Sequence, residues 1–557
     1  MNHKLVRLVF VSLLAFLSIG LAATLALAAQ GEASIDKPSA DRGIAQATYT
    51  YTTVITVTSG TDPTTSQSTT CYTDPPGAAG PPASPCTLRR AIVEARAVSG
   101  RPVLISFNIP TTETQSYSST LGIWHIYLQA TSDASVLRRL NGQIIIDGST
   151  QPGGRATGPK IILVGPTTGQ KDGPVVGDVA GNDGHVIRGL GFQNFGTHMF
   201  VNTDNNLIEN NWFGLNDEGT GVYLRANNPQ DGSGSGGIDM GGGTGGAEFN
   251  TIQNNVFAGF DGVAVALRGG SNIFTGNYVG TQADGNVVKN ADPALWCTTE
   301  DWLGGGGLSV EGISQRIENN IIAGLRQEIF VLSQQPDALR VTVVGITGHT
   351  IRNNRIGVDI DNTEVGACGR GILLTGDMKN TLIADNTIVN TRLSGISLND
   401  SLYDECTLRS NVIKQTNAWP AVSGNPKPED AIQLGPLLPD PFEFFKPAKV
   451  TTINGTAVSG VSGDSSACPN CVVELFLDDT DAVTETLQSL AVITATADGS
   501  WSATLPFALA ANQGVRTTST SAQFGTIPNI SKGTTTGLSN LYRSAYKVFL
   551  PVVIRNP

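Results

Sequence analysis

The chain has 557 residues, of which 35 are Lys or Arg, 47 are Asp or Glu and 65 are glycine, and its net charge is −12. An acidic surface of this kind excludes nucleic acid as a natural partner, since a polyanion would need a bridging cation. Only 15% of the residues are charged, and with so much glycine this composition is typical of a turn-rich β protein; the length exceeds what one compact core supports.

The first 28 residues read as a signal peptide. Lys4 and Arg7 precede an apolar run from Leu8 to Leu27, followed by Ala28 in a small-residue cleavage pattern. The alternative is an uncleaved membrane anchor, because the run is long enough to span a bilayer. Cleavage removes two bases and no acid, which takes 35 bases to 33 against 47 acids and the net charge to −14. We therefore expect a secreted or cell-surface protein with no membrane span after signal removal.

Two segments lie between the signal peptide and the repeats. Residues 29–48 form a polar leader that we expect to be mobile, and residues 49–102 an N-terminal strand, a disulfide loop and a capping helix. The helix is predicted from apolar residues spaced so that they lie on one face, namely Leu88, Ala91, Ile92, Ala95 and Val98. A solenoid needs its open apolar end covered, and this helix precedes the repeats directly.

Residues 103–415 carry a repeat in which a short apolar motif ends in asparagine. The anchor residues of seven copies are separated by 44, 22, 43, 34, 32 and 25 residues, mostly one or two units of about 22 with loop insertions. A second repeat, glycine followed by alternating apolar residues, starts at Gly237, Gly262, Gly307, Gly371 and Gly395. Two or more short strands per unit predict a parallel β-helix, in which the asparagines form a buried structural ladder rather than a site. The ladder residues are Asn211, Asn255, Asn277, Asn320, Asn354, Asn386 and Asn411.

The chain also resembles a known group of proteins. The segments Thr87–Ala95, Leu104–Ile109 and Ile144–Gly153 are similar to the opening of bacterial secreted right-handed parallel β-helix proteins of the pectin-lyase-like fold, with a CSLREA-type N-terminal region. Trp212–Thr220 and Tyr278–Gly285 are similar to the loop after the asparagine strand in that group. The resemblance implies an all-β fold with a right-handed β-helix, but no single activity, because this fold carries lyases, hydrolases, epimerases and adhesins.

The C-terminal part differs in composition. A Pro-rich stretch, residues 416–447, reads as a linker or a cap. Residues 448–541 contain short alternating strands that predict a small immunoglobulin-like β-sandwich. The last residues, 542–557, read as a closing strand or a surface-retention signal.

Seven cysteines in an exported chain predict disulfides with one thiol left over. Cys71 and Cys86 bracket a Pro/Gly/Ser loop and are expected to pair. Cys468 and Cys471 precede a strand-like run rather than a helix, which favours a structural disulfide over a redox or metal pair. The sequence leaves the pairing of Cys297, Cys368 and Cys406 open, although the first two lie in loops that interrupt the repeat.

Catalytic candidates are few. In the group that the chain resembles, lyases hold Ca²⁺ with aspartates and use Arg or Lys as the base, and hydrolases use clustered carboxylates. The matching residue types are Asp359, Asp361 and Glu364, with Arg352 or Arg355 as base, and the two aspartates are expected on one strand face. The alternative is that these are solvated turn acids, as Asp217 and Glu218 are expected to be. His185 and His349 stand where Asn206, Asn250 and Asn272 stand in other coils and read as turn residues, and His125 lies in an alternating strand.

Two classes of function remain. The first is an exported structural, adhesive or carbohydrate-binding protein without catalysis, whose partner is a polysaccharide or a cell-envelope surface. The second is a polysaccharide lyase or glycoside hydrolase. No cofactor is expected apart from Ca²⁺ in the second case, and the sequence does not determine the oligomeric state.

Overall fold

The computed structural model describes residues 50–63, 71, 85–129, 135–167, 171–177, 184–223, 236–241, 247–260, 262–287, 304–332, 346–367, 369–375, 378–391, 393–398, 405–415, 430–434, 445–463, 468–481, 483–522 and 532–543. The predicted signal peptide and leader, Cys297, Cys368, most of the Pro-rich stretch and the final tail lie outside these residues. No described helix is long and apolar enough to cross a membrane.

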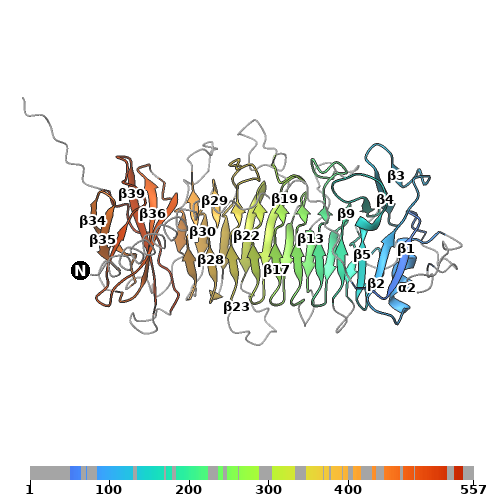
Figure 1. Cartoon of the computed structure of the whole chain (residues 1–557), viewed down its shortest axis with the longest axis horizontal. Helices are drawn as coiled ribbons and strands as arrows, with labels where there is room; N and C mark the ends of the chain where they lie inside the picture. Colours follow the sequence, from blue (N-terminus) through green and yellow to red (C-terminus); the bar gives the residue numbers. More distant parts are fainter. Residues whose placement is uncertain are drawn as a thin grey trace, which may run out of the picture. The chain divides into compact units, whose positions relative to one another are not determined.

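The repeats form a parallel β-helix built from three long sheets (Figure 1). Sheet 1 has eleven strands, all paired in parallel. In order they are β1 (Thr53–Val57), β2 (Val103–Phe107), β5 (Ile144–Asp147), β8 (Val186–Arg188), β11 (Leu207–Glu209), β14 (Thr251–Gln253), β17 (Ile273–Thr275), β20 (Arg316–Glu318), β24 (Thr350–Arg352), β28 (Leu382–Ala384) and β31 (Thr407–Arg409).

Sheet 2 has nine strands, and five of them contain or directly follow the glycine-led motifs. They are β7 (Val175–Val176), β10 (Thr197–Val201), β13 (Gly236–Met240), β16 (Val263–Leu267), β19 (Gly304–Val310), β22 (Leu325–Leu332), β26 (Ile372–Thr375), β30 (Ile396–Leu398) and β33 (Ile432–Leu434). The glycine-led repeat therefore marks one face of the solenoid.

Sheet 3 has eleven strands, and most of them begin directly after a ladder asparagine. They are β3 (Tyr117–Ser118), β4 (Ile123–Tyr127), β6 (Ile161–Val164), β9 (Leu190–Gln193), β12 (Trp212–Phe213), β15 (Val256–Phe257), β18 (Tyr278–Val279), β21 (Ile321–Ile322), β25 (Arg355–Ile356), β29 (Thr387–Val389) and β32 (Val412–Lys414). Only β3 runs antiparallel, against β4. A 3-10 turn, η1 (Gly148–Thr150), and a two-stranded pair, β23 (Ile346–Thr347) with β27 (Met378–Lys379), complete the solenoid.

Apolar side chains stack inside from coil to coil. Ile208, Ile252 and Phe274 are successive partners in sheet 1 and are fully buried. In sheet 3, the rings of Phe213 and Phe257 stack with their centroids 4.8 Å apart, which is the spacing of neighbouring strands. The core is thus a set of columns, and each coil buries its apolar residues against the coils on either side.

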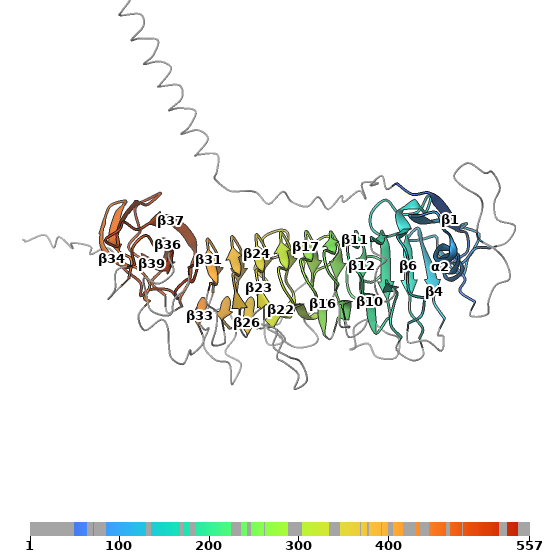
Figure 2. The same ribbon diagram turned by 90° about the horizontal axis from the view of Figure 1, so that it is seen from below.

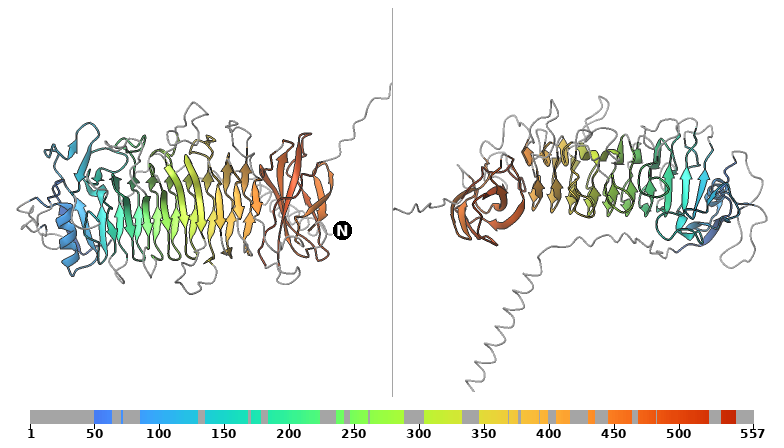
Figure 3. Two further views of the ribbon diagram at one scale, coloured as in Figure 1. Left: turned by 180° about the vertical axis from the view of Figure 1, so that it is seen from behind. Right: turned by 90° about the horizontal axis from the view of Figure 1, so that it is seen from above.

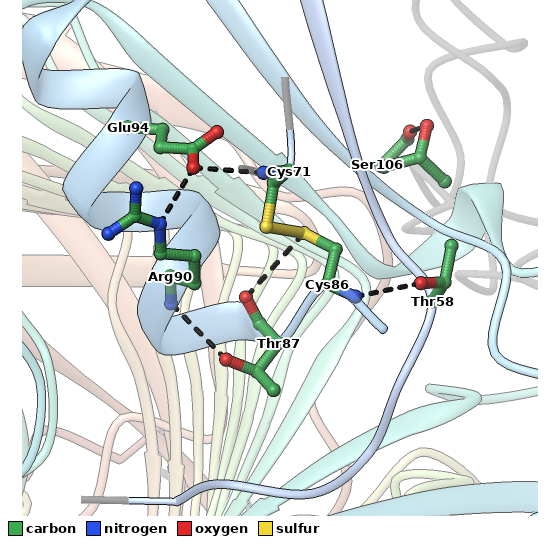
Figure 4. Close-up of a disulfide and its surroundings, with 8 residues drawn as sticks. Thr58, Cys71, Cys86, Thr87, Arg90, Glu94 and Ser106 are labelled. Atoms are coloured by element: carbon green, nitrogen blue, oxygen red, sulfur yellow. Dashed lines mark hydrogen bonds and ion pairs between the residues drawn. A yellow bond between two sulfur atoms is a disulfide. The ribbon is translucent and has the colours of Figure 1, made fainter. Parts of the chain in front are cut away.

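The single described helix, α2 (Leu88–Ala97), covers the N-terminal end beside β1 and β2 (Figure 2). Thr87 caps it, because its side chain accepts a hydrogen bond from the Arg90 N–H. Cys71 is disulfide-bonded to Cys86, and the Cys71 N–H donates to Glu94 on the helix at 2.9 Å (Figure 4). The expected helix and the expected disulfide thus belong to one cap.

The C-terminal strands form two three-stranded antiparallel sheets with a shared apolar core that includes Val458, Leu475 and Trp501. One sheet contains β34 (Lys449–Asn454), β35 (Ala457–Val461) and β38 (Ser500–Thr504), and the other β37 (Gln488–Thr494), β36 (Val472–Asp479) and β39 (Gln513–Thr520). Cys468 is disulfide-bonded to Cys471 directly before β36. An immunoglobulin-like topology remains a prediction.

This C-terminal module covers the last coil of the solenoid, as seen from behind in Figure 3. The Leu408 N–H donates to the Thr535 hydroxyl, the Ser410 N–H to the Glu474 carboxylate, and the Ile413 N–H to the Thr486 carbonyl. These backbone groups belong to the last coil and have no further coil to pair with. The module therefore satisfies them, as a cap does at the end of a solenoid.

Candidate functional site

The seven predicted asparagines form one buried column at the corner between sheets 1 and 3. The Asn255 side-chain amide donates to the Asn277 Oδ1 at 3.1 Å, and the Asn255 backbone N–H donates to the same oxygen at 2.9 Å. The same pair of bonds links each member to the next. The residue before each ladder asparagine has a left-handed φ, for example Asn254 and Gly276, which explains the Asn-Asn and Gly-Asn pairs in the sequence.

A second buried column lies at the corner between sheets 2 and 1. The Asn250 side chain donates to Asn272, whose backbone N–H donates to Gln315, and the Gln315 backbone N–H donates to the His349 Nδ1. Asn206 and His185 continue the column in the other direction. His185 and His349, which the sequence presented as turn residues, are therefore buried members of this column. The signal in the sequence was the polar residue that recurs five positions before six of the seven asparagines of the first ladder, the exception being Asn411.

We expect His349 to make stability depend on pH. Burial lowers its pKa from 6.5 to about 4, so native His349 stays neutral and accepts its hydrogen bond. Between pH 6.5 and about 4 the unfolded chain gains a proton that the native chain does not, so stability falls as the pH falls, by roughly 3 kcal/mol at 1.36 kcal/mol per pKa unit. Urea unfolding at pH 7 and pH 4 should show this loss largely removed in His349→Gln, the residue type that the column already uses at Gln315. An equal loss in both proteins would contradict the assignment.

The predicted acidic candidates do not form a common site. The expectation that Asp359 and Asp361 share one strand face is wrong, because β25 ends at Ile356 and both residues lie in the following turn. Asp359 is buried, and its Oδ1 accepts the backbone N–H groups of Asp361 and Thr363. Glu364 instead pairs with Lys414 at 2.5 Å. The hydrogen bonds of Asp359 are therefore those of a turn stabilised by its own side chain.

The two basic candidates, Arg352 and Arg355, also bond to neighbouring groups of the protein. Arg355 donates to the Asp359 carbonyl and to the Asn362 side chain, and burial lowers its pKa. Arg352 pairs with Glu318 at 3.2 Å. Neither guanidinium is directed to a carboxylate cluster in the described part of the chain.

One group of three acids does converge within the described residues. Oxygen atoms of Asp478, Asp479 and Glu485 lie within 4.8 Å of one another, a spacing that a hard cation could use. Asp478 already pairs with Arg516, and Glu485 accepts the Gln415 backbone N–H at 2.6 Å. Burial raises the pKa of Glu485 to about 8, so this acid serves the contact between module and solenoid in its protonated form at neutral pH.

A different set of side chains meets on the outer surface of sheet 3. The alternation of β4 directs His125 and Tyr127 outwards, and the His125 Nε2 lies 3.0 Å from a carboxylate oxygen of Asp217. Gln193 on β9 donates to the same carboxylate at 3.0 Å, and Arg155 donates to the Asp217 backbone carbonyl. We name these five residues the Tyr127 site.

The fold brings this site together across several coils. The row of sheet 3 residues in register with His125 runs through Ile162 and Gly191 to Trp212, and Asp217 follows Trp212 in the loop after β12. Arg155 lies over the Trp212 ring, with its guanidinium carbon 4.6 Å from the ring centroid. A Cβ on Gly158 would come within 2.5 Å of that ring, so glycine is needed for this close approach.

Charge and exposure differ sharply within the Tyr127 site. Burial by itself would raise the pKa of Asp217, but hydrogen bonds from His125 and Gln193 and the charge of Arg155 outweigh it and lower the pKa. Burial lowers the pKa of Arg155 to about 10. Tyr127 stays 51% exposed, and its ring stacks on His125 with centroids 5.5 Å apart. The site therefore presents an open aromatic ring beside a fixed carboxylate and a fixed imidazole.

Sequence reasoning missed this site. Asp217 was expected to be an ordinary turn acid, and it lies 92 positions from His125. Only the alternation of His125 and Tyr127 in one strand could have indicated an outward-facing pair.

Comparison with known proteins shows distant similarity. No protein-family model matches the chain, and no curated protein matches it. Among solved structures, a tailspike protein of E. coli bacteriophage HK620 in complex with a pentasaccharide is 11% identical, with 78% of this chain and 88% of that chain covered and a TM-score of 0.31. The A-module of an Azotobacter vinelandii mannuronan C-5 epimerase is 13% identical over 63% and 94%, with a TM-score of 0.27. PfbA, a surface adhesin of Streptococcus pneumoniae, is 11% identical over 75% and 94%, with a TM-score of 0.29. Similarity at these values says nothing about the activity of this chain.

Proposed function

We propose that the chain is an exported β-helix protein that binds a polysaccharide at the Tyr127 site without cleaving it. The observation that carries the proposal is the exposed Tyr127 ring beside the Asp217 carboxylate. Sugar rings offer C–H groups on their faces, which pack on an aromatic ring, and hydroxyl groups at their edges, which need acceptors and donors. Tyr127 supplies the first kind of contact, and Asp217 with His125 supplies the second.

The same residues speak against a glycoside hydrolase. That reaction uses two carboxyl groups, one of which must carry a proton at the working pH and therefore has a raised pKa. The pKa of Asp217 is lowered instead, and its neighbour Glu218 is exposed. Asp217 is thus suited to remain a hydrogen-bond acceptor.

A polysaccharide lyase is the second candidate, and one contact favours it. The His125–Asp217 pair lies beside the Tyr127 phenol, and a hydrogen-bonded imidazole can accept a proton from a bound sugar. Incubation with acidic polysaccharides, followed by the ultraviolet absorbance of unsaturated products, separates the two candidates. We expect no product from the protein, and product formation that His125→Gln abolishes would put the lyase first.

Binding is expected to depend on the Tyr127 ring. In affinity electrophoresis through gels that contain neutral or acidic polysaccharides, Tyr127→Ala should weaken retardation about tenfold, the effect of losing one well-placed aromatic contact. Tyr51→Ala is the matched control, because Tyr51 is also exposed, at 42%, but lies outside the site. Equal retardation of the two variants by every polysaccharide that retards the parent protein would refute the site.

A further inference from the structure

The charges that solvent reaches at the Tyr127 site are negative. The Asp217 side chain is 27% exposed, and the next residue, Glu218, is exposed as well. The guanidinium of Arg155 is covered instead, because its Nε and Nη2 atoms are buried, its Nη1 donates to the Asp217 carbonyl, and the group lies over the Trp212 ring. A ligand at this site therefore meets the two carboxylates before it meets the cation.

Two further bases near β4 are engaged elsewhere. Lys160 lies directly before β6, at the opposite end of the β4–β6 strand pair from Tyr127, and its ammonium donates to the Gln151 carbonyl at 2.9 Å. Arg89 donates to a backbone carbonyl just beyond the end of β4, and it is paired with the carboxylate of Asp62 at 2.5 Å. The first base is thus remote from the Tyr127 ring, and the second is neutralised by an acid.

The Tyr127 ring offers a surface that attracts cations. It is 51% exposed, and the His125 ring lies alongside it with the centroids 5.5 Å apart. Burial and, to a smaller extent, the charge of Asp217 raise the pKa of the Tyr127 phenol, so the phenol is neutral at physiological pH. The face of a neutral aromatic ring carries negative potential and attracts an ammonium group within about 6 Å of its centroid. The ring and the carboxylates therefore favour a ligand of the same charge.

We propose that the Tyr127 site selects polysaccharides that carry amino groups, such as polymers of glucosamine. The ammonium group lies over the Tyr127 ring and pairs with Asp217 or Glu218, which adds an ionic contact to the packing of the sugar ring. An acidic polysaccharide would bring its own carboxylates against these acids, and an N-acetylated sugar offers no positive charge. The inference rests on the function proposed above, because it specifies the charge of the polysaccharide that the same site binds.

The test compares two oligosaccharides of equal length, one of glucosamine and one of N-acetylglucosamine, by calorimetric titration of the full chain. At about pH 5.5 the carboxylates are ionised and the amino groups carry their protons. The glucosamine oligomer should bind about tenfold more tightly than the acetylated one. In about 0.5 M sodium chloride the preference should largely disappear, because salt screens exposed charges. Tyr127→Ala should abolish the preference in either buffer.

Two charge variants locate the preference on the protein. Glu218→Gln removes an accessible carboxylate and leaves the His125–Asp217 pair in place. It should weaken binding of the glucosamine oligomer about threefold and leave binding of the acetylated oligomer unchanged. Asp361→Asn is the matched control, because Asp361 is an exposed acid in the turn after β25, several strands away along sheet 3. It should change neither affinity.

The outcomes separate this inference from the proposed function. Equal binding of both oligomers, weakened in Tyr127→Ala, would overturn the selectivity and keep the binding site. A preference for glucosamine that persists in Tyr127→Ala, or that Asp361→Asn reduces as much as Glu218→Gln does, would reflect the acidic net charge of the chain and also overturn the inference. So would the absence of glucosamine binding. Failure of the proposed function shows differently, as binding of every polysaccharide that Tyr127→Ala leaves unchanged.

Discussion

Removal of residues 447–557 is expected to make the protein aggregate. The C-terminal module satisfies backbone N–H groups of the last coil through Thr535, Glu474 and Thr486. Without it, the last strands of three sheets present unpaired edges and an open apolar core, which template pairing with other chains. Size-exclusion chromatography with light scattering should find no monodisperse species in the truncated protein.

The control is a chain that ends after Arg543, which keeps every described strand of the module. It should elute as the parent protein does and unfold at the same temperature. A truncated solenoid that is monodisperse, with an unchanged Tm, would show that residues 447–557 are an appended domain and not a cap.

The second large effect is expected from Asn354→Leu in the middle of the first ladder. The Asn354 side chain donates to the Ile317 carbonyl and to Asn386, and its oxygen accepts both the backbone and the side-chain N–H of Asn320. Leucine offers none of these bonds and leaves buried partners unsatisfied at about 1–3 kcal/mol each. We expect a loss of at least about 3 kcal/mol in the free energy of unfolding, measured by urea titration, with a lower Tm.

Asn353→Gly is the matched control for this substitution. Asn353 is the adjacent residue with a φ of 53°, a conformation that glycine adopts without strain, so its replacement should change stability by less than about 0.5 kcal/mol. Similar losses in both variants, or no loss in Asn354→Leu, would argue against the ladder as a source of stability.

The sequence by itself determined the solenoid, because most coils repeat the same short motif at the corner between two strands. The apolar anchor, the residue suited to a left-handed φ and the ladder asparagine are all within five positions of one another, as in Ile351, Asn353 and Asn354. Their spacing therefore records the register of the strands, and the observed partners Ile317, Ile351 and Ile383 follow from it. The capping helix was equally local, since its apolar spacing and its Thr87 cap lie within one short segment.

Only the tertiary structure decided which polar residues meet. Asp217 contacts His125 across 92 positions, through the loop that follows β12, and no local pattern in the sequence encodes the path of that loop. Asp359 and Asp361, two positions apart, instead lie in a turn. The backbone N–H groups of Asp361 and Thr363 in that turn donate to the Asp359 carboxylate. Strand register follows from short-range periodicity, whereas loop paths and side-chain partners depend on contacts between coils that are far apart in the chain.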